Sequence, residues 1–261
     1  QEVPRRGSVA AALIDRLQPY IQRASEFSGW DFSFIESTTV GSPLPWNYEV
    51  LARQHAAAAR CVLDLGTGGG EVLSRIATGQ AASLVATEQW HVNAPVAYER
   101  LQPLGMPVVR ARSDAHLLPF RDDAFDLVLS RHEAIEPVEV DRIVAPGGIV
   151  LTQQVMADNW PELTAFFPQK TIFPDHFAAY HNAFVSLGYT VRMQQHNMKT
   201  AYRSLGDLVV MLLIAKDYIP DFDIERDAEA LLAVESALGT PVGIVLTEPR
   251  YLLEARKPLA P

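Results

Sequence analysis

The chain has 261 residues, of which 48% are hydrophobic, and its formal net charge is −9 at pH 7. This composition is typical of a globular protein that buries a sizeable core without disulfides, and Cys61, the single cysteine, has no partner within the chain. The acidic balance argues against a nucleic-acid partner, because such proteins concentrate Lys and Arg on one face.

Membrane, export and metal-binding patterns are missing from the sequence. No stretch approaches the ~18 apolar residues that span a bilayer, and the N-terminus lacks the residue order of a signal peptide. We therefore expect a cytoplasmic protein without membrane contact. His176 and His181 lie five positions apart on one predicted helix and do not share a face, so no metal site is predicted.

The N-terminal part of the chain is predicted to be helical. Apolar residues at helical spacing predict a helix over residues 9–24, and the alanine-rich residues 48–59 predict another. Residues 41–46, with two prolines, predict the loop between them.

Short apolar runs then alternate with helical segments. Strands are predicted over residues 60–65, 83–87, 107–110, 125–130 and 148–155, and helices over residues 71–77 and 92–104. This alternation predicts a parallel sheet with helices on both faces. Glu139 and Asp141, before the fifth strand, are expected on a solvated face.

The last third of the chain follows a different pattern. A helix over residues 175–187 is stopped by Gly188, and two further strands are predicted over residues 189–193 and 250–255. Between these strands, residues 205–216 are very apolar, residues 219–222 form a turn, and residues 226–238 have helical periodicity. We expect an α/β fold with a seven-stranded, mostly parallel sheet. Its parts are an N-terminal helical cap (1–45), a core (46–200), a helical insertion (201–243) and a final core strand (244–261).

The strongest functional signal is the glycine-rich run from Asp64 to Glu71, which follows one predicted strand and opens a helix. Dinucleotide-binding turns have the pattern G-x-G-x-x-G, whereas Gly66, Gly68 and Gly70 are spaced one residue more tightly. Acidic residues at both ends of the run would repel a pyrophosphate but tolerate a ligand with an ammonium and a sulfonium. The alternative is a glycine-rich turn with no ligand.

A carboxylate also ends the next predicted strand, at Glu88. At this place a carboxylate accepts hydrogen bonds from both ribose hydroxyls of an adenosine. The two signals together favour an adenosine-containing cofactor on this turn.

These residues resemble the motifs of class I S-adenosyl-L-methionine (SAM) dependent methyltransferases, which have a Rossmann-like fold. The first motif is similar to residues 62–71, and later motifs are similar to residues 113–115 (SDA), 118–120 (LPF), 125–128 (FDLV) and 146–148 (PGG). Ala145 replaces the usual basic residue before the last of them. Residues 151–155, 207–209 and 219–222 resemble a narrower, type 11-like bacterial subgroup that includes natural-product enzymes.

The resemblance implies a role for each motif residue. Asp64, Gly66, Thr67 and Gly68 would hold the methionine part of SAM, and Glu88 its ribose. The other implied cofactor-binding residues are Gln89, Ser113, Asp114 and Ala115 beside the adenine, and Arg131 through its backbone carbonyl.

Substrate and catalytic residues are less marked. Trp46 and Tyr48 are candidates to close over the cofactor and bind substrate, or they are packing residues. Methyl transfer is an in-line displacement that depends on alignment and on the exclusion of water. Where the acceptor must lose a proton, His132 is the candidate general base, with Glu133 as orienting group or substitute. A histidine at this place is otherwise a solvated or packing residue.

The sequence leaves three functions open. The first is methylation of O, N or C on a small molecule enclosed by the helical insertion, with S-adenosyl-L-homocysteine (SAH) as coproduct. The second is methylation of rRNA or tRNA, and the third is SAM binding without catalysis. A monomer and a homodimer are both compatible with the sequence.

Overall fold

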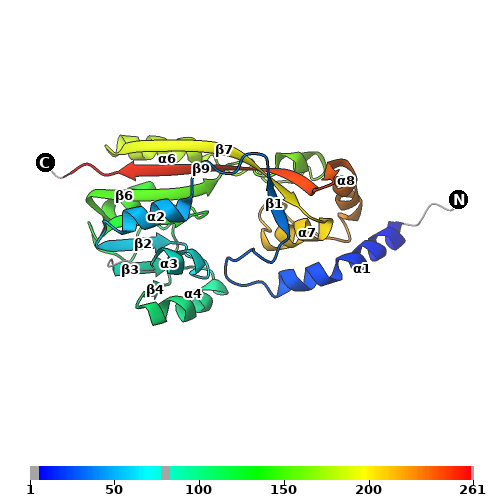
Figure 1. The fold of residues 1–261 in the computed structure, drawn as a ribbon, viewed down its shortest axis with the longest axis horizontal. Helices are drawn as coiled ribbons and strands as arrows, with labels where there is room; N and C mark the ends of the chain where they lie inside the picture. The colour runs from blue at the N-terminus through cyan, green and yellow to red at the C-terminus, as the bar shows by residue number, and fades with distance from the viewer. Residues whose placement is uncertain (1–5, 78–82, 260–261) are drawn as a thin grey trace.

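The computed structural model describes residues 6–77 and 83–259 (Figure 1). Its strands are β1 (Ser37–Val40), β2 (Cys61–Leu65), β3 (Ser83–Thr87), β4 (Val108–Val109), β5 (Phe125–Arg131), β6 (Val144–Val155), β7 (Thr190–Tyr202), β8 (Gly239–Thr240) and β9 (Gly243–Arg256). The α-helices are α1 (Arg6–Ser25), α2 (Tyr48–Ala56), α3 (Glu71–Ile76), α4 (Asn93–Leu101), α5 (Pro137–Ile143), α6 (His176–Ser186), α7 (Leu205–Ile214) and α8 (Ala228–Leu238). Two 3₁₀ helices, η1 (Gln102–Leu104) and η2 (Pro161–Ala165), complete the described elements.

The strands form one sheet in the order β1-β7-β9-β6-β5-β2-β3-β4, with β8 beside β9. Strands β2 to β6 are parallel, whereas β7 and β9 are antiparallel. The predicted α/β class and mostly parallel sheet are confirmed. The described chain adds β1 and β8 to the seven expected strands. Both are too short to show a hydrophobic period, and β1 lies within the segment that was expected to be helical.

Helices cover both faces of the parallel part of the sheet. On one face, α2, α3 and α4 pack on apolar side chains of β2, β3 and β5, and on the other face α5 and α6 do the same. Residues on each strand therefore alternate between two buried layers, which is why these strands are almost continuously apolar. The sheet thus fixes the ends of β2, β3 and β5 at one edge.

The two antiparallel strands are much longer than predicted. β7 and β9 have 13 and 14 residues and pair along their whole length, from Thr190–Arg256 to Tyr202–Ile244. The sequence prediction missed this length because residues 194–199 of β7 are mostly polar and half-exposed.

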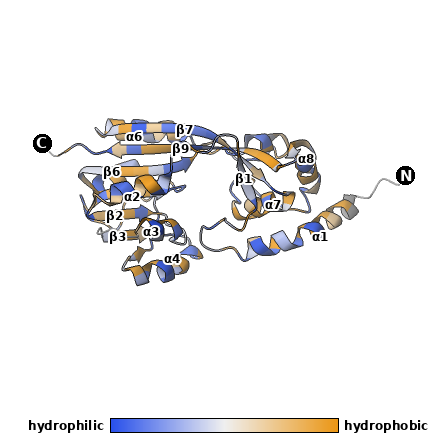
Figure 2. Cartoon of the chain, viewed as in Figure 1, coloured by the Kyte–Doolittle hydropathy of each residue, from blue (hydrophilic) through white to orange (hydrophobic). Residues whose placement is uncertain are grey.

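The far ends of β7 and β9 leave the core and carry a second cluster of helices, here called the outer lobe (Figure 1). Its core joins apolar residues of α1, η2, α7 and α8 with the ends of β7 and β9. Figure 2 shows the apolar residues of α7 beneath the strands of this lobe. The strands β7 and β9 therefore link the hydrophobic core beside the sheet to the hydrophobic core of the outer lobe.

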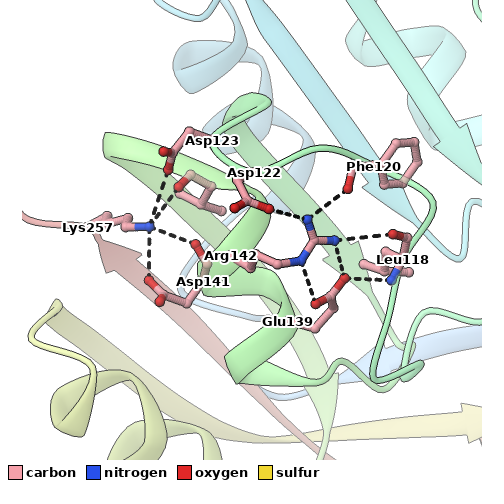
Figure 3. Close-up of polar contacts among 9 residues, drawn as sticks. Leu118, Phe120, Asp122, Asp123, Glu139, Asp141, Arg142 and Lys257 are labelled. Carbon is pink, nitrogen blue, oxygen red and sulfur yellow. Dashed lines mark hydrogen bonds and ion pairs between the residues drawn. The ribbon is translucent and has the colours of Figure 1, made fainter.

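The loop before β5 is held by the buried residue Glu139 on α5, contrary to the expected solvated face. Glu139 is 5% exposed, and its Oε1 accepts hydrogen bonds from Leu118 N at 2.6 Å and Arg142 Nη2 at 2.5 Å. Arg142 also donates to the carbonyl oxygens of Leu118 and Phe120 (Figure 3). The sequence pattern missed this role because α5 is a short helix and its acidic residues looked exposed.

Replacing Arg142 with alanine is expected to destabilise the protein by about 2–3 kcal/mol, because it leaves the buried Glu139 carboxylate without its charged partner. A loss of roughly 5–10 °C in Tm should follow in thermal unfolding at pH 7. Arg142 holds the pKa of Glu139 below its ordinary value of 4.5. The stabilisation is therefore present above that pH and is lost as the pH falls through the folded-state pKa. Arg121→Ala, an exposed arginine in the same loop, is the matched control. An equal loss in both variants would contradict the proposed anchoring.

Candidate active site

The glycine-rich turn is held against the end of β3 by three hydrogen bonds. Gly66 N donates to Thr87 Oγ1 at 3.1 Å, Thr67 N to the Thr87 carbonyl oxygen at 2.9 Å, and Gly68 N to Glu88 Oε2 at 2.8 Å. Gly66 and Gly68 have φ of 67° and 66°, in the left-handed region where only glycine is free of strain. The tight glycine spacing therefore places a residue with positive φ at every second position of the turn.

Glu88 lies at the end of β3 with both carboxylate oxygens in use. Oε2 accepts from Gly68 N, and Oε1 accepts from Trp90 N at 2.7 Å. Burial raises the pKa of this carboxyl group, while the backbone hydrogen bonds oppose the shift. The structure therefore brings together Glu88 and the turn, as the sequence predicted, and each oxygen keeps lone pairs for a ligand.

A segment between α1 and β1 covers this turn, and sequence reasoning missed it. Gly29 N donates to Asn93 Oδ1 at 2.8 Å, and Trp30 N donates to Glu71 Oε1 at 3.2 Å. A Cβ atom on Gly68 would lie 2.7 Å from the Cβ of Trp30. The signal available in the sequence was the run of aromatic residues around Trp30, whose ring meets those of Phe27 and Phe32 edge to face.

Buried polar groups gather beside the turn. Asp64 is 8% exposed, and burial raises its pKa to about 7. In the described part of the chain, Tyr48 Oη, Thr67 Oγ1 and Arg131 Nε are buried without a hydrogen-bond partner. Because buried polar atoms are rarely left unpaired, these groups indicate a polar ligand at this place. An ammonium and carboxylate, as in the methionine part of SAM, match this set.

The predicted adenine-side residues lie in the loop after β4 and at the end of β3. Ser113 is buried, and Asp114 accepts two hydrogen bonds from Arg112 at 2.9 and 3.0 Å. Gln89 is exposed and donates to Glu133 Oε1 at 3.5 Å. Burial, then the nearby carboxylates of Glu88 and Asp114, raise the pKa of Glu133 to about 7.

A cavity of about 890 Å³ lies between this turn and the outer lobe. One end is formed by Glu71, Arg131 and His132, and the other by residues of β7, α7 and β9. Six aromatic side chains contribute to its wall: Trp30, Phe32, Trp160, Phe173, Tyr202 and Tyr218. Among the described residues that line it, neither Trp46 nor Tyr48 occurs, so their predicted contact with substrate stays a prediction.

His132 lies on this cavity, in a left-handed backbone conformation with φ of 61°. Its Nε2 lies 3.1 Å from Gln153 Nε2, and Trp46 Nε1 donates to Gln153 Oε1 at 2.8 Å. The bond from Trp46 orients the amide so that its NH₂ group faces the imidazole. His132 Nε2 then accepts a hydrogen bond, which leaves its proton on Nδ1. Burial, then the charges of Arg250 and Arg131, lower the pKa of His132 well below 6.5.

Two further observations on the described residues concern membrane-spanning helices and metal sites. No helix among them combines the length and apolar character needed to cross a bilayer. They also contain no group of three or more His, Cys, Asp or Glu side chains placed to hold a metal ion.

Comparison with known proteins identifies the core. Residues 63–152 match the family described as methyltransferase domain, which spans β2 to β6 and includes the glycine-rich turn. Residues 63–152 therefore form a methyltransferase domain. The buried polar groups around Asp64 fit SAM, the methyl donor that the sequence resemblance implies. No curated protein matches the chain.

Several solved structures have a similar fold over most of this chain. A protein of unknown function from Deinococcus radiodurans R1 is 16% identical, with a TM-score of 0.63 over 92% of this chain and 99% of its own. A putative methyltransferase from Bacillus halodurans C-125 is 17% identical, with a TM-score of 0.59 over 80% and 98%. The [4+2]-cyclase SpnF is 16% identical, with a TM-score of 0.56 over 99% and 98%. At these identities the likeness is one of fold.

Proposed function

We propose that this methyltransferase acts on a small molecule enclosed between its core and its outer lobe. The observation that carries the proposal is the cavity, which begins at Arg131 and His132 beside the glycine-rich turn and continues under α7. Its volume of about 890 Å³ is within the range of small-molecule sites, and its wall is rich in aromatic side chains.

The residues of the turn would hold SAM in its usual class I place. Glu88 would bind the ribose, and Asp64 and Arg131 would bind the ammonium and the carboxylate of the methionine part. The side chain of Glu133 lies directly over Gly66, because a Cβ atom on Gly66 would be 2.3 Å from Glu133 Cγ. When bound, SAM supplies an electrophilic methyl group on a sulfonium. Because Asp64 and Glu133 have pKa values of about 7, both carry negative charge for a cationic ligand at higher pH.

The protein would promote methyl transfer mainly by aligning the acceptor with the methyl group and by excluding water. Trp30 closes one side of the turn, and α7 closes the far side of the cavity. His132 borders the cavity with a neutral ring, which donates a hydrogen bond from Nδ1, or accepts a proton at Nε2 after Gln153 Nε2 has moved away from it. The choice between these roles depends on the acceptor atom.

A nucleic-acid acceptor is disfavoured by the site as well as by the charge of −9. The cavity is lined by both acidic and basic side chains, and its described lining residues offer no basic stripe for a phosphate backbone. Natural-product acceptors fit the aromatic wall better.

Replacing Glu88 with alanine is expected to weaken SAH binding about 10- to 100-fold, because it removes a charged acceptor for the ribose and the bond that holds Gly68. Isothermal titration calorimetry on both proteins measures this. The matched control is Glu99→Ala, an exposed carboxylate on α4. If wild-type protein does not bind SAH, or if Glu88→Ala binds it equally well, the proposed function is wrong.

A further inference from the structure

Arg250 on β9 is held in the cavity wall by a buried polar network. Its Nη1 donates to Asn159 Oδ1 at 2.8 Å, and its Nη2 donates to Glu248 Oε2 at 3.1 Å. Glu248 Oε1 accepts from Trp160 Nε1 at 3.0 Å and from Tyr202 Oη at 2.5 Å. The side chains of Arg250 and Glu248 are only 12% and 9% exposed. The guanidinium is therefore fixed in one orientation before any ligand arrives.

This guanidinium keeps donors available. A third bond runs from Nη1 to the carbonyl oxygen of Pro249, so the protein accepts three of its five N–H groups. Within the described residues, Nε has no hydrogen-bond acceptor. Arg250 lines the cavity, so these remaining donors are available to a molecule bound there.

Two guanidinium groups lie on the same side of this cavity. Arg131 and Arg250 both line it, and each lowers the pKa of the buried His132. Arg250 also has Glu248 beside it, so it can accept an anionic ligand only through the donors that Glu248, Asn159 and Pro249 leave free. In this partly buried place a charge-assisted hydrogen bond to an anion is stronger than one in water.

We propose that the acceptor of this methyltransferase carries a carboxylate, bound by Arg250, on an aromatic or apolar body. The proposal rests on the proposed function and names its substrate class. A planar carboxylate matches the fork of a guanidinium, and the carboxylate of Glu248 beside Arg250 repels a phosphate dianion more than a monoanion. Trp160 and Tyr202, which hold Glu248, also present rings to the cavity and would contact the body of the acceptor.

The position of Arg250 also suits this role. Arg250 pairs with Val155 at the carboxyl end of β6, and Arg131 lies at the corresponding end of β5. Ligands of parallel α/β sheets bind beyond these ends. A carboxylate on Arg250 would place the rest of the acceptor toward His132 and the glycine-rich turn.

Calorimetric titration with matched pairs of acid and amide tests the proposal. SAH-saturated protein is titrated with naphthalene-2-carboxylate and 3-phenylpropionate, and with their uncharged carboxamides. We expect at least one acid to bind about tenfold or more tightly than its amide. Arg250→Gln should abolish this preference, whereas Arg256→Gln, an exposed arginine on the same strand, should retain it.

Arg250→Gln leaves Glu248 buried without its partner, so the double variant with Glu248→Gln is titrated in parallel as a neutral replacement. Equal binding of acids and amides by the wild type would overturn the proposal, as would a preference that survives in both Arg250 variants. Titration with SAH alone distinguishes a failure of the proposed function from a failure of the carboxylate site. Loss of SAH binding in the wild type contradicts the proposed function, whereas normal SAH binding without acid preference contradicts only the carboxylate site.

Discussion

Replacing Gly68 with aspartate is expected to raise the Kd for SAH more than about 100-fold, which amounts to loss of binding in a calorimetric titration. The new Cβ would lie 2.7 Å from the Cβ of Trp30 and 4.0 Å from Oε2 of the buried Glu71. The substitution thus fills the turn and adds a negative charge beside a buried one.

Gly105→Asp is the control for backbone strain. Gly105 has φ of 76°, like Gly68 in the left-handed region, but a Cβ there would have no atom within 4 Å. Both variants carry the cost of aspartate at positive φ, and only Gly68→Asp blocks the turn. Circular dichroism establishes that each is folded. Unchanged SAH affinity in Gly68→Asp would contradict the assignment of the turn to the cofactor.

Replacing His132 with alanine is expected to lower kcat about 100-fold with an acceptor identified by the titrations above, and to change SAH affinity less than about twofold. His132 lies on the cavity wall next to Gln153, whereas the bonds that shape the glycine-rich turn come from Thr87 and Glu88. His181→Ala, on the exposed face of α6, is the matched control. Full activity of His132→Ala would remove His132 from the mechanism.

The pH dependence of kcat separates the roles of His132 and Glu133. Burial keeps the pKa of His132 well below 6.5, so its ring is already neutral at pH 7 and rising pH adds nothing through it. Glu133, with a pKa of about 7, loses its proton in this range. We therefore expect any rise in rate near pH 7 to persist in His132→Ala, and to fall in Glu133→Gln to the part that Asp64 contributes, whose pKa is also about 7. A rise that disappears with His132 would show that His132 itself titrates there.

Local pattern was sufficient to predict the parallel core and its cofactor turn. The strands β2, β3, β5 and β6 are largely buried on both faces, so each contains a short apolar run in the sequence. The glycine spacing at Gly66, Gly68 and Gly70 encodes the backbone conformation directly, because all three residues have positive φ. The position of Glu88 beside the turn was also predictable, because it ends the parallel strand next to the one that the turn follows.

Tertiary pairing determines the length of β7 and β9, which exceeds the predicted length. Their outer halves contain polar residues such as Gln194 and Asn197, which have no strand period of their own. They are held by hydrogen bonds to a partner strand rather than by one buried face. Glu139 was misjudged for a similar reason, because its burial depends on Arg142 and on a loop that precedes it in the chain.

The acceptor side of the site also belongs to the tertiary structure. Trp30 and Arg250 lie outside every motif named above, and the motif at residues 151–155 gave no role to Gln153, because each of these side chains acts on a neighbour from another element. The sequence by itself determined the class I core, the glycine-rich turn and the acids around it, because these depend on local backbone geometry and strand burial. Only the tertiary structure decided where the cavity lies and which charges line it, because packing of the outer lobe against the core creates both.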